Sequence, residues 1–401
     1  MRFNPWNSIA DLPRGIWLTF AATLINRSGT MALPFLVLYL TQSHGFTAAQ
    51  AGLAVAIYGL GSLVSGPLAG WICDRIGPLW VIQSSLLISG LLLATFPLAQ
   101  SYAAILMLTF VWAFVGEAYR PASSAYLSDL VPSEQRKTAY ALYRLAVNLG
   151  MSVGPLLGGL LASRVSYPAL FWVDGATSVL AGVVFALAHR PPRPSSLPGV
   201  RSENCDSLLK AEQFSAWSDP RLLYFLASIL LAAMVFFQFE GPLPLFMVRD
   251  LGLAESVYGA MFLINTLLIV FCEVPLNIAT SGWPHQRLLA LGAFLTALGF
   301  GGLTFATGTF GVAATIVIWT FGEMILMPGS VAYVADISPS NRRGSYLGAY
   351  HATISVAFGL GPWIGTILLD QYGAAVVWST AFCAGFLSTA LLSRVSTPPN
   401  R

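Results

Sequence analysis

The chain has 401 residues, of which 56% are hydrophobic and only 9% are charged, and its formal net charge is +3. Soluble globular proteins carry about a quarter charged residues, so this composition excludes that class and predicts a membrane protein. The small positive charge excludes the basic surface of a nucleic-acid-binding protein. The four cysteines, Cys73, Cys205, Cys272 and Cys383, are scattered and form no CxxC pair, so we expect neither a disulfide framework nor a metal site. We also expect no cofactor.

Apolar runs of about 20 residues or more, enough to cross a bilayer, follow one another along the chain. Only helices and closed barrels satisfy the backbone in lipid, and these runs are too long for barrel strands. The sequence therefore predicts an all-α membrane protein with twelve transmembrane helices. The expected spans are residues 14–41, 48–73, 79–98, 103–130, 137–163, 167–189, 220–248, 254–280, 287–306, 309–337, 343–370 and 374–395.

A polar, proline- and serine-rich stretch separates the first six spans from the last six. We therefore expect an N-terminal six-helix half at 1–189, a linker at 190–219 and a C-terminal six-helix half at 220–401. If the N-terminus is cytoplasmic, fifteen Lys and Arg residues fall in inside segments and only Arg164 and Arg249 fall outside. The positive-inside rule then predicts that the linker and both termini are cytoplasmic. We expect the protein to lie in the cell inner membrane.

The two halves contain the same segment. Residues 121–159 read PASSAYLSDLVPSEQRKTAYALYRLAVNLGMSVGPLLGG, and residues 328–366 read PGSVAYVADISPSNRRGSYLGAYHATISVAFGLGPWIGT. A constant offset of 207 residues pairs Asp129 with Asp336 and Arg136 with Arg343. Chance does not keep one register over such a length, so the chain is a duplicated protein. Internal repeats of this length are typical of secondary transporters.

The second span ends in a stretch of glycines and charges, Gly70-Trp-Ile-Cys-Asp74-Arg75-Ile-Gly77. It resembles the G-x-x-x-D-R/K-x-G signature between helices 2 and 3 of the major facilitator superfamily. The resemblance extends over essentially the whole chain and implies two pseudo-symmetric six-helix halves. The basic residues that follow this signature in the family are absent here, and Ser281 replaces the acid in the second half. An ordinary tight turn is the alternative interpretation.

This resemblance implies a conformational latch at the cytoplasmic face. The small residues would permit close helix contact, and Asp74 and Arg75 would hold one conformation. The repeated acid–base pairs are expected to act as gates and loop anchors rather than as substrate ligands. The latch residues are then Gly70, Asp74, Arg75, Gly77, Asp129, Arg136, Asp336 and Arg343.

Spans 137–163 and 343–370 share a pattern of glycines around a proline. The pattern resembles the GxxxGPxxGG motif of drug:proton antiporters, which implies an exporter of drug-like compounds or dipeptides. Plain helix packing is the alternative, because glycine and proline are common in membrane helices. An arginine frequent in the fourth span of such exporters is replaced here by Trp112. The proposed helix-bend residues are Gly150, Gly154, Pro155, Gly158, Gly361, Pro362 and Gly365.

Ionisable residues inside spans are costly in lipid, and they therefore mark candidate functional positions. Glu323 has no basic residue within helical reach on its own span, which makes it the main candidate for carrying a proton. Glu117, Glu240 and Glu273 are the other candidates. Alternatively, Glu117 forms an ion pair with Arg120 three residues on, and Glu240 is a solvated cap near the outer end.

Polar and aromatic side chains in the same spans predict a substrate cavity. Aromatic residues there favour amphipathic solutes, including cations, although they could instead face lipid or pack in the core. His351, the repeat mate of Arg144, could be a packing residue. The predicted cavity residues are Asn26, Arg27, Tyr119, Arg120, Tyr143, Arg144, Asn148, Gln238 and His351.

These features predict a monomeric, proton-driven antiporter that exports small molecules by alternating access. No GxxxxGK[ST] signature occurs, so we expect an ion gradient rather than ATP to drive it. An uptake symporter for peptides, sugars or siderophore-like solutes is one alternative. An intramembrane enzyme or lipid scramblase is another, although the sequence contains neither HExxH nor GxSxG.

Overall fold

The computed structural model describes residues 12–188, 218–339 and 342–395, and this part of the chain contains helices but no strand. The expected linker at 190–219 lies almost entirely outside the described residues. The first half comprises α2 (Arg14–Ser28), α3 (Leu36–Gln42), α4 (Ala48–Ile76), α5 (Pro78–Thr95), η1 (Phe96–Leu98), α6 (Tyr102–Gly116), α7 (Tyr119–Leu130), α8 (Ser133–Arg164) and α9 (Tyr167–Ala188).

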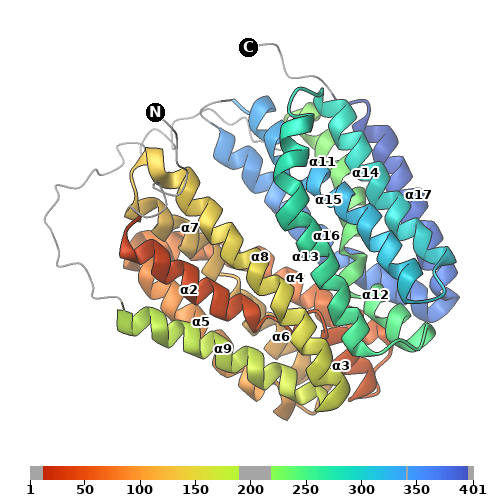
Figure 1. Cartoon of the computed structure of the whole chain (residues 1–401), viewed down its shortest axis with the longest axis horizontal. Coiled ribbons are helices and arrows are strands. Elements are labelled where there is room, and N and C mark those ends of the chain that lie inside the picture. The colour runs from red at the N-terminus through yellow and green to blue at the C-terminus, as the bar shows by residue number, and fades with distance from the viewer. Residues whose placement is uncertain (1–11, 189–217, 340–341, 396–401) are drawn as a thin grey trace, which may run out of the picture.

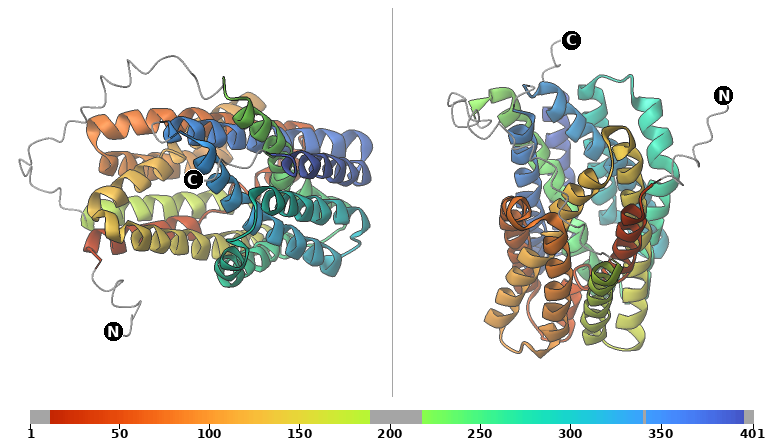
Figure 2. Two further views of the ribbon diagram at one scale, coloured as in Figure 1. Left: turned by 90° about the horizontal axis from the view of Figure 1, so that it is seen from above. Right: turned by 90° about the vertical axis from the view of Figure 1, so that its left-hand side faces the viewer.

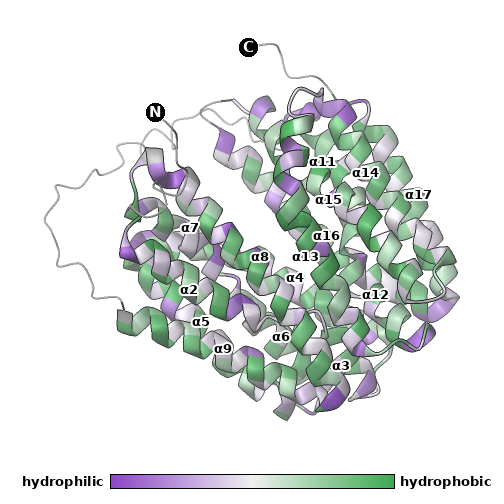
Figure 3. Cartoon of the chain, in the orientation of Figure 1, coloured by the Kyte–Doolittle hydropathy of each residue, from purple (hydrophilic) through white to green (hydrophobic). Residues whose placement is uncertain are grey.

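The second half begins with α11 (Pro220–Phe236), followed by η3 (Phe237–Glu240), α12 (Pro242–Leu245) and η4 (Phe246–Asp250). It continues with α13 (Glu255–Thr280), α14 (His285–Gly302), η5 (Leu303–Phe305), α15 (Thr309–Ile337), α16 (Arg343–Tyr372) and α17 (Ala374–Leu392). The two sets of helices form two bundles that lie side by side (Figures 1 and 2). Most residues of the helices are hydrophobic, and many of the hydrophilic ones lie near the helix ends (Figure 3).

Within the described residues, eleven helical stretches are long and apolar enough to cross a membrane. They match the predicted spans from the second onward to within a few residues. The first predicted span, 14–41, is not one continuous helix, because α2 ends at Ser28 and α3 begins at Leu36. The chain therefore crosses twelve times, but its first crossing is broken.

The first crossing of the second half is broken at the matching place. Adding the repeat offset of 207 to residues 29–35 gives 236–242, where α11 gives way to η3 and α12. A third break, at Glu117 and Ala118, separates α6 from α7. Irregular backbone within a membrane is tolerated only where protein or a water-filled cavity satisfies it. In transporters, paired broken helices mark the substrate region.

Two seams join the bundles, one between α4 and α16 and the other between α8 and α13. Glycine permits very close approach at each seam. An added Cβ on Gly59 would lie 2.8 Å from the Cα of Gly359, and one on Gly259 would lie 2.3 Å from the carbonyl oxygen of Pro155. The largest buried apolar cluster also joins the halves and includes Phe35, Tyr258 and Trp378. The bundles are therefore packed tightly together toward the end where α3 and α12 lie (Figure 1).

Candidate functional site

A central cavity of about 290 Å³ lies between the two bundles. Both broken first crossings contribute to its wall, as does the break between α6 and α7. Four of the predicted cavity residues line it, namely Asn26, Arg27, Tyr119 and Arg120, and so do two of the candidate proton carriers, Glu117 and Glu240. The aromatic residues Trp112, Phe237 and Phe239 also line it.

Glu117 and Arg120 form an ion pair in this cavity. The Arg120 Nε lies 3.0 Å from Glu117 Oε2, and the hydroxyl of Tyr58 donates to Glu117 Oε1 at 2.8 Å. Glu117 stands in the break that follows α6, so its side chain is presented where the helix is interrupted. The predicted ion pair of Glu117 with Arg120 is therefore present, but it joins the break to the first turn of α7 rather than lying within one helix. The pair still faces the cavity, where a substrate could compete for either partner.

Asp174 in α9 holds the first break in place. One of its oxygens, Oδ2, accepts hydrogen bonds from the backbone N–H groups of Met31 (3.1 Å) and Ala32 (3.0 Å). One turn further along α9, Ser178 accepts from the Asn26 amide at 2.9 Å. Without these partners, backbone groups at the break would be buried unsatisfied, which costs about 1–3 kcal/mol each. Asp174 was missed from the sequence, although a lone carboxylate inside an apolar span was the signal that could have found it.

An aromatic pocket of about 190 Å³ adjoins the central cavity and is lined mainly by the second half. It contains two carboxyl groups, Glu240 and Glu323, and its described lining includes no Lys, Arg or His. Five of its lining residues are aromatic: Phe236, Phe239, Tyr258, Phe262 and Trp319. The rings of Phe239 and Trp319 stack with centroids 6.2 Å apart. Acidic groups beside aromatic faces are a suitable environment for an organic cation.

The two carboxyl groups of this pocket differ in their surroundings. Glu240 is 6% exposed, and its Oε2 has no hydrogen-bond partner among the described residues. The interpretation of Glu240 as a solvated cap is therefore wrong, because the break after α11 turns it inward. Glu323 Oε2 accepts a hydrogen bond from Asn265 at 2.9 Å, and Asn265 also donates to Thr320 at 3.0 Å. Neither carboxyl has a cationic partner in the described part of the chain.

The tyrosine at the pocket's edge connects the two broken crossings. The hydroxyl of Tyr258 in α13 lies 3.2 Å from the carbonyl oxygen of Pro34 and 3.2 Å from that of Phe239. Those carbonyls belong to the first and second break, respectively. A hydroxyl has one hydrogen to donate, so it can serve only one carbonyl at a time.

A side pocket of about 370 Å³ adjoins the aromatic pocket and shares some of its lining residues. It contains four further predicted residues, Arg144, Asn148, Glu273 and His351, and it shares Glu323 with the aromatic pocket. Arg144 in α8 donates to Glu273 Oε1 in α13, so this ion pair connects the two halves. Glu273 is thus already paired with a cation, which sets it apart from Glu240 and Glu323.

Two predicted cavity residues lie in packed positions. Gln238 is buried in the second break, where its Nε2 donates to the carbonyl oxygens of Met234 (3.0 Å) and Gly361 (2.8 Å). Tyr143 packs at the edge of two buried clusters that include Tyr119 and Leu127. Both residues support the cavity wall in this conformation, and a direct contact with substrate stays a prediction.

The glycine–proline motif, which lies in α8 and α16, packs closely against the two broken crossings. A Cβ on Gly154 would lie 2.7 Å from the carbonyl oxygen of Thr30, and one on Gly150 would lie 2.3 Å from the Cβ of Arg27. In the second half, a Cβ on Gly361 would lie 2.7 Å from the carbonyl oxygen of Met234. Gly158 likewise faces Met31 and Phe35, and Gly365 faces Gln238. Helices α8 and α16 continue through the motif prolines, Pro155 and Pro362.

The expected latch residues lie near the ends of their helices. Gly77 links α4 to α5 with φ +88°, a conformation that favours glycine, and the guanidinium of Arg75 lies 3.9 Å from the ring centroid of Trp71. The expectation of close helix contact is wrong for Gly70, because a Cβ there would meet nothing within 4 Å. Asp74 is exposed.

The repeated acidic and basic residues make different contacts in the two halves. Asp336 contacts His285 at 3.0 Å. Arg136 reaches the carbonyl oxygen of Ser128 at 3.4 Å. Asp129 and Arg343 are exposed at the corresponding helix ends. A role for any of these residues as a latch stays a prediction.

Comparison with known sequences identifies the class of protein. The sequence model of the Major Facilitator Superfamily matches residues 17–271 and 241–401. The chain therefore belongs to this superfamily of membrane transporters, and it is a multi-pass secondary active transporter rather than an enzyme.

Three relatives are similar to this chain over most of its length. The chain is 26% identical over 361 residues to the uncharacterized MFS-type transporter YqjV of Bacillus subtilis, covering 89% of this chain and 87% of that protein. It is 22% identical over 357 residues to the quinolone resistance protein NorA of Staphylococcus aureus, covering 87% and 88%. It is also 22% identical over 352 residues to the Na(+), Li(+), K(+)/H(+) antiporter of Planococcus maritimus, covering 81% and 82%. These relatives support the drug:proton antiporter branch.

Solved structures show the same fold. The nucleoside transporter NupG aligns with TM-score 0.79 and 15% identity over 94% of this chain and 98% of that one. An auto-inhibited POT family peptide transporter aligns with TM-score 0.76 and 16% identity over 97% and 98%. At this level of identity the likeness concerns the fold, which is that of the major facilitator transporters.

Proposed function

We propose that this chain is a proton-coupled antiporter that exports small amphipathic solutes, drug-like compounds or small peptides, across the cell inner membrane. The single observation that carries the proposal is the aromatic pocket, where Glu240 and Glu323 lie among five aromatic residues without a cationic partner in the described chain. A buried carboxyl group is costly when charged, so each favours a bound proton or a bound cation. A cationic solute and a proton would therefore compete for the same two groups.

The placement of the cavity between two bundles suits alternating access. The halves, at 1–189 and 220–401 with a linker at 190–219, would rock about the seams so that the cavity opens to one side at a time. The fifteen-to-two distribution of Lys and Arg supports cytoplasmic termini. The motif that packs against both breaks, and the relative named as a quinolone resistance protein, support export over uptake. We expect the transporting unit to be a monomer.

Proteoliposomes with an acidic lumen and a clamped membrane potential test this proposal. Transport is followed for ethidium, a quinolone, a dipeptide and a sugar, with protein-free liposomes as the control. An antiporter accumulates its substrate in the acidic lumen as protons leave, and we expect this for ethidium or the quinolone. A symporter would instead expel its substrate from the acidic lumen, which would contradict export. Proteoliposomes that move none of the four would contradict the proposed substrate class.

A further inference from the structure

Three arginines line the cavities described above, and they differ in whether a carboxylate neutralises them. Arg120 pairs with Glu117 at 3.0 Å, and Arg144 pairs with Glu273. Arg27, in the last turn of α2, belongs to none of the ion pairs in the described chain, and its buried Nε has no hydrogen-bond partner there. An arginine without a carboxylate is costly inside a membrane, and it therefore marks a functional position.

The surroundings of Arg27 neutralise its charge only in part. Asp174 lines the same cavity, but its Oδ2 already accepts from the backbone N–H groups of Met31 and Ala32, and it forms no ion pair with Arg27. The guanidinium carbon lies 5.9 Å from the ring centroid of Tyr119, at the outer limit of a cation–π contact. The negative end of the α2 dipole adds a weak attraction. The guanidinium can therefore still accept an anion as a partner.

Close packing fixes the base of this side chain. A Cβ on Gly150 would lie 2.3 Å from the Cβ of Arg27, so α8 passes directly behind it. The preceding residue, Asn26, is held by its hydrogen bond to Ser178 at 2.9 Å. Arg27 thus lines the central cavity from a position that is set before any ligand arrives, which lowers the entropic cost of binding.

The unpaired charges of the two adjoining cavities have opposite signs. The central cavity and the aromatic pocket share Met151, Phe239 and Glu240 in their linings. The unpaired cation, Arg27, belongs to the first half, whereas the carboxyl groups without a cationic partner, Glu240 and Glu323, belong to the second half. A molecule that spans both spaces meets a positive group at one end and acidic groups at the other, with aromatic faces beside the acidic end.

We propose that Arg27 is an anion subsite and that the transported solutes are amphoteric, with an oxyanion such as a carboxylate at one end and a cationic nitrogen at the other. A guanidinium can bind a carboxylate through two parallel hydrogen bonds. The cationic end would lie near Glu240 and Glu323 among the aromatic rings. This proposal rests on the proposed function and narrows its substrate class, because a simple cation would leave Arg27 unpaired.

Two dyes that differ at one group test the subsite. Rhodamine 110 has a free carboxylate and rhodamine 123 is its methyl ester, so they share a cationic ring system and only the first has an anion. Fluorescence anisotropy measures the binding of each dye to the full chain purified in detergent. The dissociation constants are compared for the unmodified chain, for Arg27→Gln and for the control Arg164→Gln. The control removes the same charge from an exposed position at the end of α8.

The unmodified chain should bind rhodamine 110 more tightly than rhodamine 123. Arg27→Gln should weaken the binding of rhodamine 110 about tenfold, the factor that corresponds to 1.4 kcal/mol. It should leave the binding of rhodamine 123 unchanged, because the ester offers no charge to the guanidinium. Arg164→Gln should bind both dyes as the unmodified chain does.

Three results in the variants would overturn the anion subsite: equal weakening of both dyes by Arg27→Gln, no weakening of rhodamine 110, or the same selective weakening in Arg164→Gln. If Arg27→Gln does not fold, the unmodified chain still decides, because equal binding of the two dyes or a preference for the ester would contradict the subsite.

Failure of the proposed function gives different results. An unmodified chain that binds neither dye would contradict the proposed class of amphipathic solutes, and the subsite with it. Selective binding of rhodamine 110 without accumulation in an acidic proteoliposome lumen would contradict antiport alone and leave the subsite supported.

Discussion

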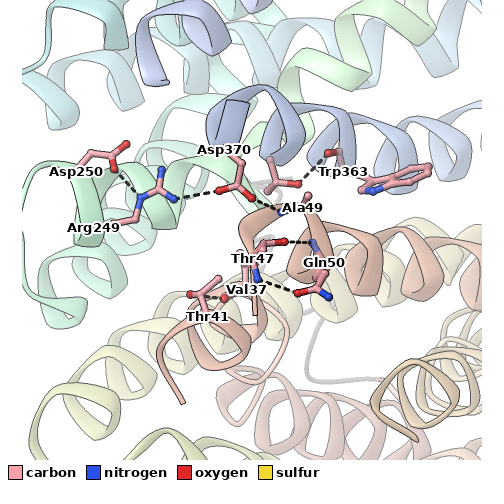
Figure 4. A network of polar contacts seen from close by, with 10 residues as sticks. Val37, Thr41, Thr47, Ala49, Gln50, Arg249, Asp250, Trp363 and Asp370 are labelled. Atoms are coloured by element: carbon pink, nitrogen blue, oxygen red, sulfur yellow. Dashed lines mark hydrogen bonds and ion pairs between the residues drawn. The ribbon is translucent and has the colours of Figure 1, made fainter. Parts of the chain in front are cut away.

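The carboxylate of Asp370, near the end of α16, accepts a hydrogen bond from the backbone N–H of Ala49 at 2.9 Å, across the boundary between the two halves (Figure 4). Ala49 stands in the first turn of α4, whose N-terminus is also closed by a capping box between Thr47 and Gln50. The other oxygen of Asp370 lies 3.4 Å from Arg249. One side chain thus caps a helix of the opposite half and pairs with a cation of its own half.

We predict that Asp370→Ala favours the opening of this end of the transporter. Loss of a helix cap costs about 1 kcal/mol, or roughly a fivefold change in the population of the closed state. Accessibility of a cysteine placed at Ser62, in the wall of the central cavity, to an impermeant thiol reagent measures the change. The matched control is Asp250→Ala, which removes only the contact of 2.7 Å between Arg249 and Asp250 within one half. If the cysteine at position 62 reacts with the thiol reagent at the parental rate in both variants, Asp370 does not hold this end closed.

Asp174 offers a second prediction, on the stability of the first break. Asp174→Asn keeps an oxygen that can accept from Met31 and Ala32, whereas Asp174→Leu leaves two buried N–H groups unsatisfied, at about 1–3 kcal/mol each. We expect the asparagine variant to keep most of its thermal stability in detergent and its substrate KM. The leucine variant should lose stability and raise KM. Equal behaviour of the two variants would show that the hydrogen bonds do not hold the break.

The glycine–proline motif makes a third prediction, about close packing. Gly154→Ala places a Cβ against backbone carbonyl oxygens of Thr30 and Arg27, at 2.7 and 2.9 Å, and backbone cannot yield as a flexible side chain can. We expect a loss of about 1–3 kcal/mol of stability, typical of overpacking. Gly66→Ala, in open space on α4, is the control and should be neutral or slightly stabilising. Thermal unfolding in detergent compares them, and an unaffected Gly154→Ala would remove the packing role of this glycine.

The orientation in the membrane makes a fourth prediction. Cys205 belongs to the expected linker, which lies outside the described residues. In a background with Cys205 as the sole cysteine, an impermeant thiol reagent should label it in inside-out vesicles and leave it unlabelled in intact cells. Labelling in intact cells would reverse the topology proposed from the charge distribution.

Much of the architecture followed from the sequence, because its signals are periodic and local. Apolar runs predicted the helices to within a few residues, and the repeat between Pro121 and Pro328 predicted two related halves. The break after Ser28 was missed, because most of the residues that form it are apolar and the apolar run resumes directly after Thr30. The carboxylate of Asp174, which accepts from the backbone of the break, lies 143 residues away from Met31 in the chain.

Less of the candidate site could be predicted from the sequence, because its ion pairs and hydrogen bonds connect helices that are distant in the chain. The contact of Arg144 with Glu273 and that of Asp370 with Ala49 join opposite halves, and no spacing in the sequence encodes them. Glu323 was identified from its own span alone, since its isolation from basic residues is a local property. Gln238 shows the limit of such reasoning, because a polar residue near a break can satisfy backbone carbonyls instead of a ligand.

The most direct test of proton coupling compares two modes of transport in Glu323→Gln. Glutamine keeps the shape of the side chain and fixes it in an uncharged form. Exchange of substrate across the membrane needs no net proton movement, so we expect it to survive, at least for a neutral substrate. Accumulation driven by a pH gradient should disappear. Glu117→Gln, in the same liposome preparation, should affect binding as well, because Arg120 loses its partner at 3.0 Å.

The decisive measurement is therefore pH-driven accumulation beside exchange for Glu323→Gln and for the unmodified chain, in matched proteoliposomes. Retained exchange with no accumulation is the predicted result. If Glu323→Gln still concentrates substrate against its gradient, the proton is carried elsewhere, and the central role given to Glu323 is contradicted.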